Sequence, residues 1–581
     1  MSSARSSMMR HSLLITLVLF ATQVSGLVSK PHLGTPASAA PKASAPRASD
    51  GLLSQPRRVE KDGQIHDSLR LKGGNTAAAA PPRTRLKKLK DALFPIEGWE
   101  MAKFFSMSMM MFMIIYIYTT VRDTKDTLVV STCGAESITF LKVYGVLPAA
   151  TMFMVYYSWI SNYFSKKPLF YVTALPFLAF YGIFAWILYP NRLAIHPAIP
   201  AGLDERWQYV ALLVSNWSYS LFYIVSELWG SVGVSVLFWQ LANEITPVWQ
   251  AKRFYPLFGQ LANIAPICAG QTVAYFAKIA AEGDSAFAVS LQYTTMLILA
   301  AGACLMGLYH IIGVLDEKDV REGRKGDDHV PLNKRKKQKM SMAESFKFLV
   351  QQRYLGYLCI LVISYGLSIN LTEVIWKRMV KQAYTNKKDY QIFMGNYSSL
   401  VGAATFIIIF FGSNVVKHLG WTVGALTTPV LMGGLAAPFF MYVITNDVKN
   451  DKVALMKAVS VGMWQNILSK AIKYALFDPT KEMAYIPLDH DTKVKGKAAI
   501  DVLAARIGKS GGALVQQFIV MWFGNIIDGA GCVASVFFAT IAAWIYGVLG
   551  LASMFEEKVA AGKKASEKAA AEKEKIKAKA K

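Results

Sequence analysis

The stretch "AARIGKSGGALVQQF" (504–518) contains Gly-Lys-Ser, the tripeptide that ends a phosphate-cradling nucleotide loop. Such a loop also needs a glycine five positions before Gly508, so that bare backbone N–H groups can surround a phosphate. That position is Leu503, and the residues after it carry side chains where the loop must be open. The nucleotide-loop interpretation therefore fails. What remains is an apolar run of helical length with Arg506 and Lys509 inside it.

The composition places such a run in a membrane. The chain has 581 residues, of which 53% are hydrophobic and only 17% charged, and its mean hydropathy is +0.31. Soluble domains carry about 25% charged residues. The run at 208–242 is too long for one straight span, so we expect it to be tilted, broken or divided in two. About twelve runs approach the length of about 20 residues that a span needs: 103–120, 140–160, 168–189, 208–242, 255–278, 291–314, 354–376, 392–415, 421–445, 453–473, 499–523 and 527–553.

The N-terminal segment resembles a targeting sequence. Residues 1–26 have Arg5 and Arg10, then a short apolar core and small residues, which is the pattern of a signal peptide. Residues 27–90 are predicted to be disordered and transit-peptide-like, since 27–49 are rich in Ser, Ala and Pro and contain basic but no acidic residues. A signal peptide followed by a transit peptide directs proteins to plastids that were acquired secondarily. The alternative is a signal peptide followed by a disordered head.

The charge distribution predicts two halves. The net charge of +25 concentrates in "RTRLKKLK" (83–90), "NKRKKQK" (333–339) and the tail after Lys558. Positive segments collect on the membrane side that is not crossed during insertion. All three share one side if six spans precede the central segment and six follow it. These basic runs are better explained by their effect on membrane topology and by their solvation than by binding of nucleic acid. We do not expect a nucleic-acid partner. The predicted organisation is a first six-helix half (91–314), a basic central loop (315–350), a second half (351–553) and a lysine-rich tail (554–581).

A weak internal repeat supports this division. A shift of 245 residues places Asn263 on Gly508 and Gln271 on Gln516, although so few matches can also arise by coincidence. We therefore predict an all-α membrane protein of about twelve transmembrane helices in two six-helix halves, as in major-facilitator-type transporters.

Charges inside the spans are the candidate functional residues. An ionisable residue at mid-bilayer costs about 3 kcal/mol on insertion scales, so it persists mainly beside a wet cavity or a partner. Arg506 and Lys509 lie three residues apart on one helical face; the alternative is a pair that extends to the membrane surface. In "RDTKDTLVV" (122–130), Arg122 and Lys125 share a face, with aspartates near enough to neutralise them. An ordinary cap at a helix end explains one of these charges, not four.

Two carboxylates and several aromatic residues accompany these cations. Glu227 and Glu373 either pair with basic residues for structural reasons or couple and gate transport, because burial raises a carboxylate's affinity for a proton. Lysines and arginines neutralise phosphates, and aromatic rings stack a base. These residues indicate an organic-anion carrier and leave nucleotides, sugar phosphates and dicarboxylates open. No Cys/His cluster or catalytic spacing is found, so we expect no metal, no cofactor and no enzymatic activity. The further candidates are Lys470, Lys473, Tyr223, Trp229, Trp239 and Trp376.

Six motifs resemble the nucleotide transporters of plastids and obligate intracellular bacteria (the ATP/ADP translocase type), and the resemblance is strongest to those of diatom plastids. It extends from about residue 95 to 553 along the sequence. The motifs are "RDTKDTLVV", "SELWGSVGVSVLFWQLAN", "AKRFYPLFGQLANIAP", "NLTEVIWK", "KYALFDPTKEMAYIPLD" and "KGKAAIDVLAARIGKSGGALVQQ".

The resemblance implies a nucleotide transporter in the plastid inner envelope, with Lys125, Glu227, Glu373 and Lys509 important for transport. Family members exchange ATP for ADP and phosphate, or import a wider range of nucleoside triphosphates with protons. We expect exchange, with proton-coupled import as the alternative. A third possibility is a membrane protein that senses nucleotides without transporting them. The expected substrate contacts are Lys125, Lys509, Arg122 and Arg506, and the expected gating or coupling residues are Glu227 and Glu373.

Overall fold

The computed structural model describes residues 96–199, 205–280, 286–322, 352–489 and 504–579, together with residues 492, 496, 497 and 500. The predicted signal peptide, the transit-like segment and most of the basic central loop fall outside the described residues. Everything below concerns the helices that begin at Gly98. Within the described ranges all regular structure is helical and no strand occurs, which confirms the predicted all-α class.

The first half consists of helices from η1 to α13. Among them η1 is a 3₁₀ turn, whereas η2, η3 and η4 are π-helical segments, in which the chain turns more widely than in an α-helix. In chain order the elements are η1 Gly98–Glu100, α3 Met101–Cys133, α4 Ser137–Phe140, η2 Leu141–Val146, α5 Leu147–Ile160, α6 Lys166–Ile183, η3 Phe184–Leu188, α7 Arg192–Ile195, α8 Glu205–Ser215, α9 Trp217–Val232, η4 Gly233–Trp239, α10 Gln240–Ile245, α11 Val248–Ala262, α12 Ala265–Ile279 and α13 Ala286–Arg321.

The second half contains fewer and longer helices. A further π-helical segment, η6, follows α17 directly. The elements are α15 Arg353–Ala383, α16 Lys387–Thr445, α17 Lys452–Ile472, η6 Lys473–Phe477, α18 Asp478–Ala484, α20 Ala505–Phe523 and α21 Ala530–Lys579.

The predicted spans correspond to these helices. In the described part of the chain, nine helical stretches are long and apolar enough to cross a membrane. The helices α12, α17 and α20 occupy the other three predicted positions and are shorter or carry more charge. The overlong run at 208–242 is broken at Asn216, whose backbone leaves the helical conformation between α8 and α9. Likewise α16 contains two spans, because Gly420 lies between them at a φ of 86°, a region that favours glycine.

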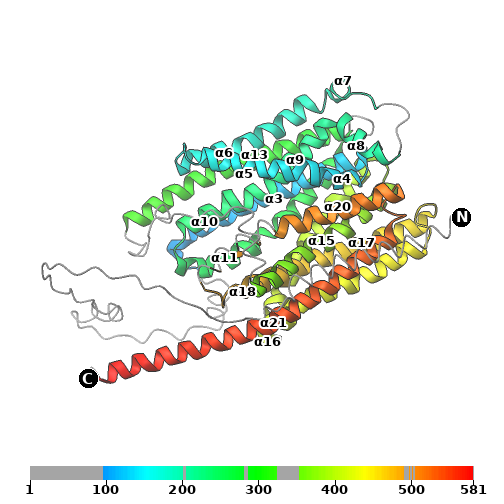
Figure 1. Cartoon of the computed structure of the whole chain (residues 1–581). Coiled ribbons are helices and arrows are strands. Elements are labelled where there is room, and N and C mark those ends of the chain that lie inside the picture. Colours follow the sequence, from blue (N-terminus) through cyan, green and yellow to red (C-terminus); the bar gives the residue numbers. More distant parts are fainter. Residues whose placement is uncertain are drawn as a thin grey trace, which may run out of the picture. The chain divides into compact units, whose positions relative to one another are not determined.

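The two halves repeat the same packing. In the first half α3 contacts α9, α12 and α13, which are the fourth, fifth and sixth spans. In the second half α15 contacts α17, α20 and α21, which hold the equivalent places. Figure 1 shows the helices α3, α6, α9 and α13 in one group and α15, α16, α17 and α21 in another. The structure therefore has the six-plus-six arrangement that the weak sequence repeat predicts.

Among the contacts that join the halves, two correspond to each other. The fifth span, α12, packs against α16, and the eleventh, α20, packs against α4 and η2. Between α12 and α16 the backbones touch: a Cβ atom on Gly270 would lie 2.2 Å from the carbonyl oxygen of Gly395. Successive spans alternate in direction, so α3 and α15 begin on one side of the membrane and end on the other. We call these the Met101 side and the Cys133 side.

Candidate functional site

The charged motif of α3 lies in the protein interior. Asp123 is fully buried, and Lys125 and Asp126 are each only 2% exposed. Arg122 is half-buried; its guanidinium lies 3.3 Å from the Asp123 carboxylate and donates a hydrogen bond of 2.9 Å to the Ser398 hydroxyl on α16. The aspartates therefore neutralise their neighbouring cations, as the sequence predicts.

Six side chains from four helices form a continuous series of ion pairs, which we call the charge chain. Its first three members belong to α9 and α3, in the first half, and its last three to α15 and α17, in the second. Three ammonium groups balance three carboxylates, so the charge chain as a whole is neutral. The N–O distances are 2.9 Å for Glu227–Lys125, 2.9 Å for Lys125–Asp126, 2.8 Å for Asp126–Lys377, 3.1 Å for Lys377–Glu373 and 3.1 Å for Glu373–Lys470.

Because the charge chain is largely buried, its stability depends on which charged groups lie beside each member. A buried charge is costly without a partner, and removing one member of a buried pair typically costs about 3–5 kcal/mol. Each charge-chain lysine therefore needs a carboxylate, or another anion that can take the carboxylate's place. An incoming phosphate group is such an anion, because its oxygens accept charge-assisted hydrogen bonds from ammonium groups.

Two further lysines add positive charge beside the charge chain. Lys142, in η2, donates a hydrogen bond to the side-chain carbonyl oxygen of Asn370, and Lys509, in α20, is exposed. Neither forms an ion pair with any carboxylate of the described segments. Both act electrostatically on Glu227, whose side chain is 26% exposed and is the most accessible carboxylate of the charge chain. Positive charge is therefore in excess around Glu227.

The two cations of the "GKSGG" region have different surroundings. The whole stretch lies in helix α20, as expected for a span and not for a nucleotide loop. Lys509 acts on Glu227, whereas the Arg506 guanidinium lies 3.0 Å from the sulfur of Met154. Gln516 is buried and donates hydrogen bonds of 2.9 and 3.2 Å to backbone carbonyl oxygens of α15. The structure thus brings Lys509 to the charge chain and leaves Arg506 beside α5.

The aromatic residues predicted for the cavity already have protein partners. The Lys125 ammonium lies 3.8 Å from the ring centre of Tyr223, which is buried. Trp229 and Trp376 are fully buried, and their indole N–H groups point to backbone carbonyl oxygens of α3 and α17 at 3.4 and 3.0 Å. Trp239 packs edge-on against a tyrosine of α11. These rings fix the helices around the charges.

Two functional candidates were missed in the sequence. Lys377 follows an apolar run and precedes other basic residues, so it looks like an ordinary positive cap. Its position four residues after Glu373 was the available signal, because residues so spaced share a helical face. Lys142 lies near the start of a predicted span and also looks like an end charge. The π-helical turn that carries it is not visible in the sequence pattern.

Polar contacts also join the halves nearer the Cys133 side. Arg378 on α15 pairs with the buried Glu136 carboxylate at 3.2 Å, and the Lys381 ammonium donates to the carbonyl oxygen of Ser131. The helix α5 is largely exposed, and Met152, for example, is 71% exposed. The halves are therefore linked by ion pairs and hydrogen bonds between the charge chain and the Cys133 side.

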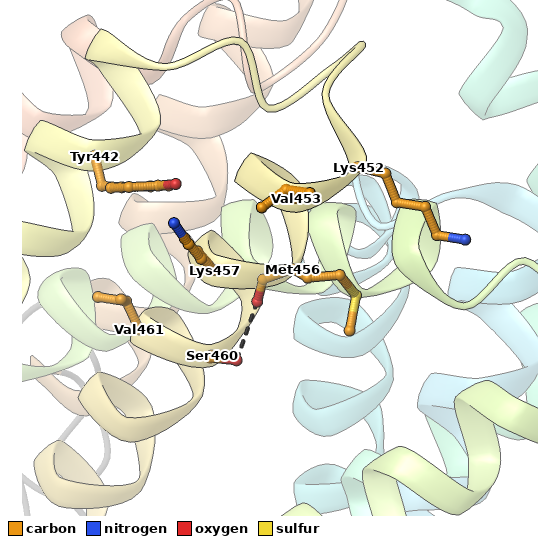
Figure 2. A pocket seen from close by; sticks show the side chains of 7 residues that line it. All are labelled: Tyr442, Lys452, Val453, Met456, Lys457, Ser460 and Val461. Atoms are coloured by element: carbon orange, nitrogen blue, oxygen red, sulfur yellow. Dashed lines mark hydrogen bonds between the residues drawn. The ribbon is translucent and has the colours of Figure 1, made fainter.

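A groove at the surface lies elsewhere. Figure 2 shows it between the end of α16 and the start of α17, with the Lys457 ammonium turned toward Tyr442 and that of Lys452 turned away. The Ser460 hydroxyl bonds within its own helix, to the Met456 carbonyl oxygen at 3.0 Å. Lys470, the charge-chain member of α17, lies nearly three turns farther along. This groove is apolar and shallow, and it does not contain the candidate site.

A helical membrane protein whose two six-span halves meet at buried charges has the build of a secondary transporter. The chain belongs to the TLC ATP/ADP transporter family, whose model matches residues 80–555.

Individual relatives agree with this assignment. The chain is 42% identical to "ADP,ATP carrier protein 1" of Chlamydia trachomatis, over 81% of this chain and 91% of the relative. It is 40% identical to "ADP,ATP carrier protein 2, chloroplastic" of Arabidopsis thaliana, over 83% and 78%. It is also 40% identical to "Plastidic ATP/ADP-transporter" of Solanum tuberosum, over 81% and 76%. The family resemblance is thereby confirmed, and the closer resemblance to diatom transporters stays a prediction.

Among solved structures, the chain is similar to a bacterial homologue of the iron transporter ferroportin in its inward-facing state. The TM-score is 0.48 and the sequence identity 12%, over 76% of this chain and 98% of that one.

Proposed function

We propose that this protein is a nucleotide transporter that exchanges ATP for ADP, together with phosphate, across the plastid inner envelope membrane. The relatives named as ADP,ATP carriers and plastidic ATP/ADP transporters support the substrates and the compartment. One structural observation carries the proposal: positive charge is in excess where a chain of ion pairs joins the two halves. A nucleotide polyphosphate has the charge and the oxygen atoms that such a place binds.

In the proposed mechanism the phosphates compete with the carboxylates. Lys125 and Lys509 bind phosphate oxygens, and Arg122 adds a guanidinium one helical turn away. The phosphates then replace Glu227 as the partner of Lys125, so the buried ammonium keeps an anion throughout. Arg506, which lies outside the charge chain, meets the nucleotide on its way to this place.

Glu227 and Glu373 are the proposed gating residues. Each holds a lysine when no substrate is present and releases it when a phosphate arrives. The charge chain runs from one half to the other. Replacing one of its carboxylates by a phosphate therefore changes how strongly the two halves are held together. Substrate binding thereby favours one arrangement of the halves over the other, as a population shift requires.

Uptake into liposomes containing the purified protein tests this function. Labelled ATP is presented outside, with ADP, buffer or ADP plus phosphate inside, and each condition is repeated with a protonophore. Exchange predicts uptake that depends on internal nucleotide and is insensitive to the protonophore. Uptake abolished by the protonophore, without need for internal ADP, would favour proton-coupled import. Binding without accumulation would identify a sensor. We expect the nucleotide to emerge chemically unchanged.

The segments outside the helical halves have proposed roles in delivery. We propose that residues 1–26 and 27–90 direct the chain to the plastid and take no part in transport. The central basic loop and the lysine-rich tail, parts of which lie outside the described residues, are proposed to fix the orientation in the membrane.

A further inference from the structure

We propose that Tyr118 of α3 and Tyr474 of η6 form the base-binding part of the substrate site, one from each half, on the Met101 side of the cations. This inference rests on the proposed function, because it assigns the contacts of the nucleotide's aromatic ring. The charge chain accounts for the phosphates and leaves the base without a partner.

Burial excludes most aromatic rings near the cations. Tyr223, Tyr390 and Tyr397 are each at most 2% exposed, so a base cannot reach their faces without displacing packed helices. Trp229 and Trp376 are fully buried. Their rings belong to the wall of the site and not to its open space.

Three tyrosines that are not buried lie within about two turns of the charges on the Met101 side, in α3, α15 and η6. Tyr118 lies one turn before Arg122, Tyr365 two turns before Glu373, and Tyr474 follows Lys473. Tyr365 stacks on Phe477 at 5.1 Å and also meets a tryptophan edge-on, so less of its ring is open to a ligand. Tyr118 is partly exposed and Tyr474 is 44% exposed, so both of these rings are accessible.

Tyr118 packs closely against α9 at a position where α9 has a glycine. A Cβ atom on Gly230 would lie 2.4 Å from the Tyr118 ring, a distance that real atoms do not tolerate. The ring therefore lies directly on the helix backbone three residues beyond Glu227. Its remaining surface is available for a stacked base, and the Arg122 guanidinium lies 5.7 Å from its centre.

Tyr474 approaches from the other half. The Lys473 ammonium lies 3.9 Å from its ring centre and pairs with Asp478 at 2.8 Å, which fixes this end of α17. Tyr118 and Tyr474 belong to different halves, and each ring lies beside a cation, Arg122 and Lys473 respectively. Their hydroxyl groups also lie within electrostatic range of each other. One helical turn, about 6 Å, separates Tyr118 from Arg122 along the axis. A ribose fills that separation between a base and its first phosphate.

The experiment compares two inhibitors of labelled ATP uptake into liposomes, with the label far below saturation. Unlabelled ATP has a base, and inorganic triphosphate has none. We expect Tyr118→Leu and Tyr474→Leu each to raise the half-inhibiting concentration of ATP about tenfold, the order of a lost stacking contact. The half-inhibiting concentration of inorganic triphosphate should be the same for these variants as for the wild-type protein. Tyr118→Phe and Tyr474→Phe keep the rings and should restore ATP inhibition.

Two further variants complete the test. Gly230→Ala displaces the Tyr118 ring and should reproduce the selective loss of ATP affinity. Tyr546→Leu is the matched control, since this tyrosine is 54% exposed on the last helix and faces Tyr357. Equal weakening toward both inhibitors, or no weakening in either leucine variant, overturns the base site. A wild-type protein that takes up no ATP overturns the proposed function instead, so the two failures are distinguishable.

Discussion

The two halves of this transporter use the same pair of helices with opposite charges. In the first half the first helix supplies a lysine and the fourth a carboxylate, Lys125 and Glu227, at 2.9 Å. In the second half the first helix supplies the carboxylate and the fourth the lysine, Glu373 and Lys470, at 3.1 Å. The architecture is repeated while the polarity of the ion pair is reversed.

The reversed pairs differ in how firmly their carboxylates are held. Glu373 has two lysine partners, Lys377 and Lys470, and its side chain is 18% exposed. Glu227 has one, Lys125, and two unpaired lysines act on it from nearby. Glu373 is therefore held by two ion pairs and Glu227 by one. We infer that repeated helices can divide the work, with the firmly held carboxylate stabilising helix packing and the less firmly held one giving way to the substrate.

The largest effect is expected from Lys125→Ala. This lysine is 2% exposed and contacts both Glu227 and Asp126, so its removal leaves Glu227 without its lysine, leaves Asp126 with Lys377 alone and takes away a proposed phosphate partner. A desolvated charge-assisted contact is worth about 1.5–3 kcal/mol, so uptake should fall by more than tenfold. Liposome uptake at matched protein levels measures this. Normal uptake by a correctly inserted variant would contradict the phosphate role of Lys125.

Exchanging the two charges of one pair separates structure from transport. The double variant Lys125→Glu with Glu227→Lys keeps an ion pair between α3 and α9. We expect it to insert normally, since α3 and α9 keep an ion pair and Asp126 keeps Lys377, yet to transport poorly because the new carboxylate faces Asp126 and the proposed phosphate position. Lys457→Ala, in the groove of α17, is the control for loss of a lysine. Wild-type uptake by the double variant would show that the polarity of the pair is irrelevant.

Lys509→Ala should act mainly on affinity. Lys509 is exposed and has no ion pair within the described segments, so its loss breaks no buried pair. We expect the concentration of ATP at half-maximal uptake to rise about tenfold, with a smaller change in the maximal rate. Uptake measured over a range of ATP concentrations decides this. A wild-type curve for this variant would remove Lys509 from the substrate site.

The glutamine variants of the two carboxylates should change rate more than binding. Glu→Gln keeps the shape and removes the charge, so both variants should still bind nucleotide and transport more slowly. The slowing should be greater for Glu373→Gln, because Lys377 and Lys470 both lose a partner, than for Glu227→Gln. Binding to detergent-solubilised protein and uptake into liposomes are compared for each. Equal wild-type rates would leave both glutamates as structural residues.

The smallest effect is expected at the N-terminus. A chain that begins at Leu86 lacks all but the last five residues of the predicted targeting segments and retains the helices of both halves that the structure describes. Once inserted, it should take up ATP at the wild-type rate. Loss of uptake despite normal membrane levels would show that the segment takes part in transport.

Hydropathy was sufficient to find the spans, because each must exclude charge over about 20 residues. The free-energy cost of placing a charge in the bilayer also identified the candidate residues that interrupt apolar runs, namely Lys125, Glu227, Glu373 and Lys509. The sequence could not show that Asp126 and Lys377, 251 positions apart, form an ion pair. That contact depends on how the first helices of the two halves meet.

The tyrosines were missed for a different reason. Aromatic residues are common throughout these spans, so the sequence does not separate Tyr118 from rings that only pack. Tyr118 is distinguished by its partial exposure and by the backbone of Gly230, which packs directly against its ring. Both are properties of the folded helices, and no spacing rule predicts them.

The touching backbones of Gly270 and Gly395 have a mechanical consequence. Where two helix backbones touch, their separation cannot shrink, so we infer that relative motion of α12 and α16 is a change in their crossing angle. Such a point works as a fulcrum. A helix that extends ten residues beyond it is a lever arm of about 15 Å, so a small rotation there becomes a displacement of several ångströms at the membrane surface. A larger residue at either position should push the two helices apart and hinder this rotation, although neither glycine is proposed to contact the nucleotide.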